Sequence, residues 1–162
     1  MSDIASYVAK IVALNGGSIV GKTRLQKSAY FLEELGVGND FIFEYYYYGP
    51  YSDEISIGVD DAKALGYLNL EWKTTKDGTK YAVFTSNSKL KEENYDKKRI
   101  SILETLSRYD SISIELAATA DFLSKNGFEI DPWKETIKRK EDKSTQERVQ
   151  KAKKLLGELE KI

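Results

Sequence analysis

The fold is decided by residues 53–85, which read DEISIGVDDAKALGYLNLEWKTTKDGTKYAVFT. The first part has helical spacing, and its apolar face is made by Ile55, Val59, Ala62 and Leu65. After Gly66 the pattern changes to alternation, with apolar side chains at positions 68, 70 and 72 separated by polar ones. Asp77-Gly78 is a hairpin turn sequence, after which the chain returns. The stretch therefore predicts a helix followed by a two-stranded antiparallel hairpin.

Two more helices are expected upstream of this stretch. The first has apolar residues at positions 4, 7, 8, 11 and 12, with Ser2 or Asp3 as its cap and Gly16-Gly17 as its end. The second opens with Thr23 and Gln26 at capping-box spacing and ends at Gly36. Between this helix and the third, which Ser52 caps, residues 41–48 form an aromatic run typical of a strand. Three helices followed by a hairpin is the order of a winged helix.

After Ser86 the chain has helical periodicity to its end. Pro132 opens a short helix, and Ser144 with Glu147 has capping-box spacing for the last one. We therefore expect a mostly α (α+β) fold with a small antiparallel β hairpin. Its winged-helix-like core would cover residues 1–88. A C-terminal helical region, residues 89–162, would pack on that core as one compact unit.

Composition narrows the chemistry that the chain can perform. It has 162 residues with no cysteine and no histidine, which removes disulfides, thiolate zinc sites and the commonest general base. Lys plus Arg is 25 and Asp plus Glu is 26, so bulk binding to polyanions is not expected. We expect no catalytic residues, no metal site and no cofactor, and therefore no enzyme. With no basic, apolar leader and no membrane-spanning stretch, a cytoplasmic location is expected.

Two functional patterns compete with this expectation. Gly16, Gly21, Lys22 and Thr23 satisfy the spacing of a phosphate-binding loop, but the residues before Gly16 have helical rather than strand periodicity. Nucleotide binding is therefore the third of the three functions considered, after protein binding and nucleic-acid binding. The winged-helix order also suggests a nucleic-acid-binding regulator. Its recognition helix, residues 53–65, carries four acidic residues against one lysine, which phosphates would repel.

Two surface features leave alternatives open. The aromatic run up to Tyr48 is either core packing or a partner surface, because tyrosine buries area while keeping a polar tip. Residues 134–154 are rich in Lys and Arg, which is typical of a solvated helix face but would also suit an acidic partner or a nucleic acid. The acidic pairs at 53–54 and 60–61 are neighbours on one helix and do not face each other, so we do not expect them to hold Mg²⁺.

Four segments together resemble the Panacea domain of SocA-type antitoxins and the related YwgA-like proteins. They are KTRLQKSAYFLEELG at 22–36, YYYYGPYS at 45–52, LGYL at 65–68 and KYAVFT at 80–85. The segment SISIELAATADFLSKNG at 111–127 is more similar to the YwgA-like branch. The resemblance implies a toxin-neutralising or protease-adaptor role, which some members of the wider family have. It carries no catalytic residues over to this chain.

The leading expectation is thus a non-enzymatic protein-binding module whose partner is a protein, with a toxin as one candidate. Leu25, Ala29 and Leu32 must turn inward, so basic residues of the same helix are expected outside. Gly49-Pro50 would hold neighbouring tyrosines in a rigid turn. The predicted partner surface is Lys22, Arg24, Lys27, Tyr46, Tyr48, Gly49, Pro50 and Tyr51.

Overall fold

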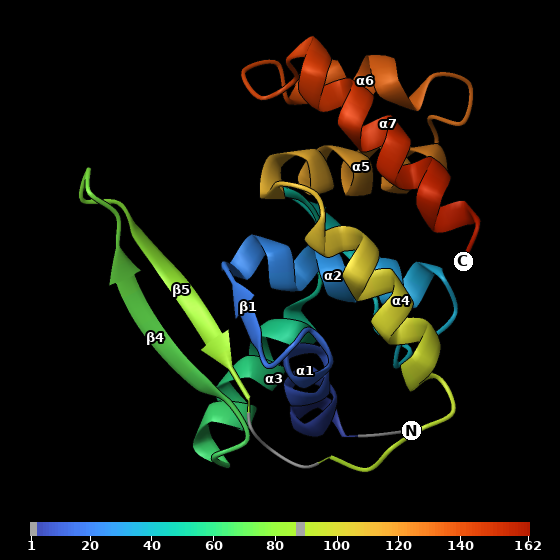
Figure 1. Cartoon of the computed structure of the whole chain (residues 1–162). Coiled ribbons are helices and arrows are strands. Elements are labelled where there is room, and N and C mark those ends of the chain that lie inside the picture. Colours follow the sequence, from blue (N-terminus) through green and yellow to red (C-terminus); the bar gives the residue numbers. More distant parts are fainter. Residues whose placement is uncertain (1–2, 87–89) are drawn as a thin grey trace.

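The computed structural model describes residues 3–86 and 90–162 and shows a mostly helical α+β protein (Figure 1). The helices are α1 (Ile4–Leu14), α2 (Lys22–Glu34), α3 (Asp53–Ala64), α4 (Asp96–Ser107), α5 (Ser111–Ser124), α6 (Pro132–Arg139) and α7 (Gln146–Glu160). The strands are β1 (Ser18–Val20), β2 (Glu44–Tyr46), β3 (Gly49–Tyr51), β4 (Asn69–Thr74) and β5 (Lys80–Thr85). The expected fold class is confirmed, and so is the order of three helices followed by a hairpin. The predicted division at residue 88 lies outside the described residues.

The larger sheet contains a strand that the sequence pattern does not predict. β1 pairs antiparallel with β5, which also pairs with β4, so the strand order is β1-β5-β4. Because β1 covers only the base of β5, the outer part of the β4–β5 hairpin has two strands and projects from the body as an arm (Figure 1).

The aromatic run forms a much shorter strand than expected. β2 holds only Glu44–Tyr46, and the chain then reverses so that Tyr45 pairs with Pro50 and Tyr46 with Gly49. Gly49 has a φ of 90°, a conformation that favours glycine, and this allows the chain to return as β3. The Gly49-Pro50 sequence is therefore part of a second small sheet and not simply the end of a strand.

Two helix caps differ from the predicted ones. The N-cap of α2 is Gly21, which has no side chain to form a cap bond, and Gln26 bonds to another segment instead of closing a capping box with Thr23. The N-cap of α7 is Thr145, whose hydroxyl accepts from the Arg148 backbone N–H, so this helix begins one residue later than expected. Asp3 caps α1 as expected. Ser52 is at the N-cap position of α3, but its side chain makes no cap bond.

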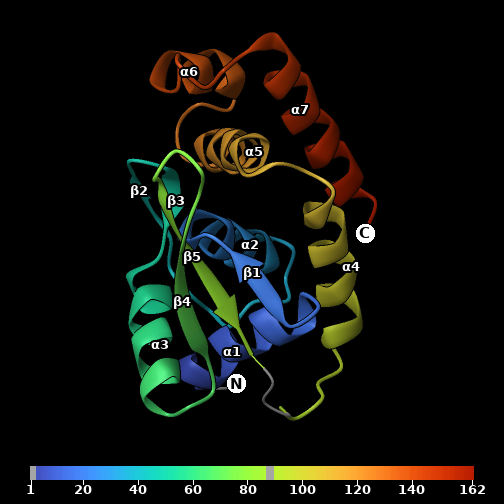
Figure 2. The same cartoon turned by 60° about the vertical axis from the view of Figure 1, so that its left-hand side comes forward.

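The hydrophobic core runs through both halves of the described chain. α1 packs on α3, α2 packs on α5, and α5 carries α6 and α7 on its other side (Figures 1 and 2). The largest fully buried apolar side chains include Tyr7, Tyr30, Phe84, Ile55 and Ile102. The core thus joins residues from before and after the undescribed segment.

A buried ionic cluster also ties α1 to α4. Lys10 lies 2.7 Å from Glu93 and 3.2 Å from Asp96, and Arg99 contacts the same two carboxylates. Arg99 is 2% exposed and also donates to the carbonyls of Val37 and Gly38. Removing one member of such a buried network leaves the others without compensation.

Within residues 3–86 and 90–162, no helix combines the length and apolar character needed to cross a bilayer.

Candidate functional site

The two segments that contribute most to the family resemblance contact each other directly. The Gln26 side chain on α2 accepts from the Ser52 backbone N–H and donates to the Ser52 carbonyl, each at 3.0 Å. Both residues are buried. One amide therefore satisfies both backbone groups of the N-cap residue that precedes α3, and this fixes the position of the β3 strand relative to α2.

Lys27 is inside the protein, which corrects the prediction that it belongs to an exposed basic face. It is 1% exposed, and its Nζ donates to the Pro50 carbonyl at 2.7 Å. Burial lowers the pKa of Lys27 to about 7, while the nearby Glu115 carboxylate acts in the opposite direction. The physical reason is that α2 is covered all round: every residue from Leu25 to Leu32 is buried.

The structure distributes the eight predicted residues over different environments. Gly49 and Pro50 are buried with Lys27. Arg24 is half-buried and donates to the carbonyls of Leu106 and Tyr109 at 3.3 and 2.7 Å, so it connects α2 to the end of α4. Lys22 is exposed, and its Nζ lies 5.2 Å from the ring of Trp72 on the arm. The predicted set is therefore not one surface.

The exposed members of the set that remain together are tyrosines at the tip of the β2–β3 hairpin. Tyr46 is 40% exposed and Tyr48 is 55% exposed. Tyr47 between them, which was not among the predicted residues, is 92% exposed. Tyr46 also packs edge-on against Tyr51, with ring centroids 4.9 Å apart. We call Tyr46, Tyr47 and Tyr48 the tyrosine tip.

Basic residues next to the tip come from the C-terminal region rather than from α2. Buried Lys140 donates to the carbonyl of Tyr47, and Lys143 Nζ lies 4.7 Å from the ring centre of Tyr48. Arg139 stacks over Tyr45 at 4.8 Å. We call Arg139, Lys140 and Lys143 the basic ridge. The sequence shows that residues 134–154 are basic, but it does not show that they contact the tyrosines.

A single buried carboxylate holds the two lysines of this basic ridge in place. Glu115 on α5 is 3% exposed and lies 3.2 Å from Lys140 and 2.9 Å from Lys143. The charge of this carboxylate also acts on Lys27 of α2. Two lysines therefore bind one glutamate, and their positive charges outweigh its single negative charge under the tip.

Close packing against α5 adds to this rigidity. A Cβ added at Gly49 would collide with Oγ1 of Thr119, which is itself buried and donates to the carbonyl of Glu115. The backbone of the turn thus packs against α5 at Gly49. The turn also accepts hydrogen bonds from Lys27 of α2 and from Lys140 of the basic ridge. The tip is held from three directions.

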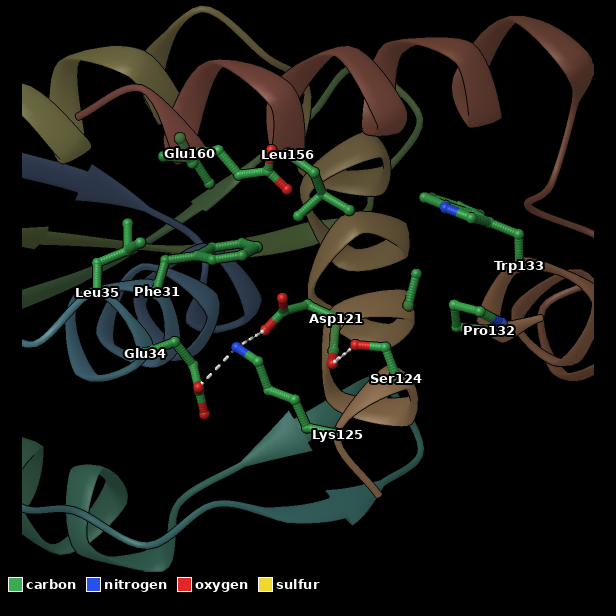
Figure 3. A pocket seen from close by; sticks show the side chains of 12 residues that line it. Phe31, Glu34, Leu35, Asp121, Ser124, Lys125, Pro132, Trp133, Leu156 and Glu160 are labelled. Atoms are coloured by element: carbon green, nitrogen blue, oxygen red, sulfur yellow. Dashed lines mark hydrogen bonds and ion pairs between the residues drawn. The ribbon is translucent and has the colours of Figure 1, made fainter. Parts of the chain in front are cut away.

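A separate cleft of about 190 Å³ lies where α2, α5, α6 and α7 meet (Figure 3). Its apolar walls include Phe31, Leu35, Leu156 and Trp133. On its floor Lys125 bridges Glu34 at 2.8 Å and Asp121 at 3.0 Å, and the Tyr30 hydroxyl also donates to Asp121. These polar groups satisfy one another, and their ion pairs and hydrogen bond connect α2 to α5.

The Gly16–Thr23 segment lacks the geometry of a phosphate-binding loop. Helix α1 precedes it, and its middle is the extended strand β1. The N–H of Gly21 donates to the Ala82 carbonyl at 2.7 Å, whereas such a loop directs its N–H groups at phosphate. The β1 strand of this segment therefore forms one edge of the larger sheet.

Helix α3 presents an acidic face. Asp53, Asp60 and Asp61 are exposed together with Lys63, as expected from the sequence. Among the described residues, no group of three or more carboxylates is placed to hold a metal ion.

Comparison with known proteins gives one distant relative. No family model matches the chain. It is similar to the protein of Bacillus subtilis (strain 168) that is described as "Uncharacterized protein YwgA", with 28% identity over 156 residues. That alignment covers 91% of this chain and 92% of the relative. The likeness therefore extends over nearly the whole length of both proteins and agrees with the YwgA-like side of the resemblance.

Proposed function

We propose that this protein is a non-enzymatic, cytoplasmic binding module that captures another protein with the tyrosine tip and the basic ridge. The observation that carries the proposal is the exposure of three consecutive tyrosines on a turn that buried contacts hold in place. Exposed aromatic rings on a turn add little to the hydrophobic core of a fold. A partner gains contact area from them, because tyrosine supplies a large surface with few rotatable bonds.

The rigidity of the turn supports this proposal. Binding costs less when the contact residues are already ordered, and here the backbone of the tip is fixed by Lys140 and by the packing of Gly49 against α5. Arg139 and Lys143 lie next to the rings, and each side chain is 33% exposed. Basic side chains around an aromatic centre suit a partner whose surface is acidic and partly apolar.

The resemblance to the Panacea domain supports a more specific version of the same function. In that version the protein is a winged-helix-like antitoxin or adaptor, and the partner is a toxin. The contact between Gln26-Lys27 and Gly49–Ser52 connects this resemblance to the tip, because the segments that carry it also position the tyrosines.

The test is capture of partners from the native host followed by mass spectrometry. Tyr47→Ala and Arg139→Gln should each remove the captured partner while the thermal melt stays nearly unchanged, since Tyr47 is nearly fully exposed and the ion pair of Arg139 with Glu135 lies at the surface. Ile57→Ala is the control, because Ile57 is likewise an exposed large apolar side chain, 55% exposed, and lies on α3 rather than on the tip. Retention of every partner by Tyr47→Ala, together with loss in Ile57→Ala, would place the binding surface on α3 instead.

A further inference from the structure

The outer edge of β4 is an unpaired strand edge in the described structure. β4 pairs with β5 on one side only, and all of its residues except Leu70 are exposed. Beyond β1 the arm has only two strands, and a two-stranded hairpin alone is marginally stable in water. Such an edge is a template for another strand. Trp72, in the middle of β4, is 57% exposed.

We propose that β4 pairs antiparallel with β4 of a second copy of this chain, with the twofold axis at Trp72. The register follows from charge. With the axis at Trp72, Glu71 of each copy lies opposite Lys73 of the other, and the two Trp72 side chains face each other. Opposite charges directly across a pair of strands stabilise it, and aromatic pairs do so as well.

Neighbouring registers are unfavourable for the same reason. Moving the axis to Glu71 places Glu71 opposite itself, and moving it to Lys73 places Lys73 opposite itself. Like charges directly opposite destabilise a strand pair. The alternating charges around Trp72 therefore favour this register over its two neighbours and make the edge self-complementary.

The arm is accessible for this pairing. It projects from the body in Figure 1, and the side of β4 away from β5 carries no other strand among the described residues. Pairing would place two β4 strands at the centre of a continuous sheet that contains β1, β5 and β4 of both copies. The tyrosine tip belongs to the other sheet, so the two surfaces are separate.

The experiment is sedimentation velocity over a concentration series of the full chain. The wild type should dimerise. E71K and K73E should each weaken dimerisation by about tenfold or more, because each replaces two attractive pairs by two repulsive ones. The double variant E71K/K73E should restore it. K76E changes charge in the hairpin turn beyond β4 and should leave dimerisation unchanged.

The decisive measurement is an equimolar mixture of the E71K and K73E chains. In the mixed pair every position again faces the opposite charge, so the two weakly associating chains should form a heterodimer. Circular dichroism of each variant checks that the fold is kept. A wild type that stays monomeric throughout, a dimer that E71K leaves intact, or a mixture that does not associate would each overturn the proposal.

Discussion

Lys27 on α2 donates a hydrogen bond to the carbonyl of Pro50, and the two atoms lie 2.7 Å apart in a buried position. This contact joins α2 to β3, and it places a lysine where only buried neighbouring groups can stabilise its charge. Its consequences for stability can be measured.

Replacing Lys27 by Met should change how stability depends on pH. The folded-state pKa is about 7 and lies below the ordinary value of 10.5, because burial disfavours the charged form. Between these values the unfolded chain binds more protons than the folded one, so the contribution of Lys27 to stability is lowest below pH 7 and rises with pH. The wild type should therefore gain stability over Lys27→Met, by at most about 1.4 kcal/mol per pH unit.

Urea unfolding of both proteins between about pH 6 and 9 measures this difference directly. The subtraction cancels the titrating groups that do not interact with Lys27, which the two proteins share. A difference that stays constant with pH would mean that Lys27 remains protonated in the folded protein over the whole range.

Gln26→Leu should lower the free energy of unfolding by about 2–4 kcal/mol. It leaves the buried N–H and carbonyl of Ser52 without partners, and each unsatisfied group costs roughly 1–3 kcal/mol. Chemical denaturation gives the value. The matched control is Gln150→Leu on the exposed face of α7, which should change stability by less than about 0.5 kcal/mol. Equal effects of the two substitutions would contradict the role given to Gln26.

Gly49→Ala should cost more than Gly78→Ala, although both glycines have a φ of 90°. At Gly78 the added Cβ meets open space, so only backbone strain of about 1–2 kcal/mol is expected. At Gly49 it also collides with Thr119. Adding Thr119→Ala to Gly49→Ala removes the colliding oxygen, and the remaining destabilisation should fall toward that of Gly78→Ala. Thermal unfolding of the four proteins tests this, and absence of any rescue would show that the collision is relieved in another way.

Glu93→Gln should make the protein less sensitive to acid between about pH 4.5 and 2. Hydrogen bonding from Lys10, supported by the charges of Lys10 and Arg99, lowers the pKa of Glu93 from 4.5 to about 2. A carboxylate with a lowered folded-state pKa stabilises the fold above its ordinary pKa, and this stabilisation is lost as the pH falls toward 2.

Acid titration followed by circular dichroism compares Glu93→Gln with Glu92→Gln, which removes the same charge from an exposed neighbour. Only Glu93→Gln should flatten the decline of stability in this window. If both variants lose stability with the same slope as the wild type, the ionic cluster around Lys10 does not depend on Glu93.

The helices were predictable because their apolar residues repeat over three or four turns. Short elements were not: β1 has three residues, and its existence depends on a partner strand more than sixty residues away in the sequence. The same limit applies to β3, because only pairing with β2 makes a strand of Gly49–Tyr51.

The candidate site was predictable in part. Aromatic composition pointed to Tyr46 and Tyr48, but it did not separate them from the more exposed Tyr47. Lys27 was placed wrongly because a helical period assumes one polar face, whereas α2 is surrounded by other elements from Leu25 to Leu32. The partners of the tip were not predictable, since Tyr47 and Lys140 are 93 residues apart in the chain.

That separation also has a consequence for synthesis. A ribosome makes the chain from its N-terminus, so the tyrosines emerge long before Lys140 does. The turn can pack against α2 early, yet its second anchor arrives only when a further 93 residues have been translated after Tyr47. The tip therefore reaches its final form only after Lys140 has been added, and a nascent chain presents its tyrosines before they are held in their binding geometry.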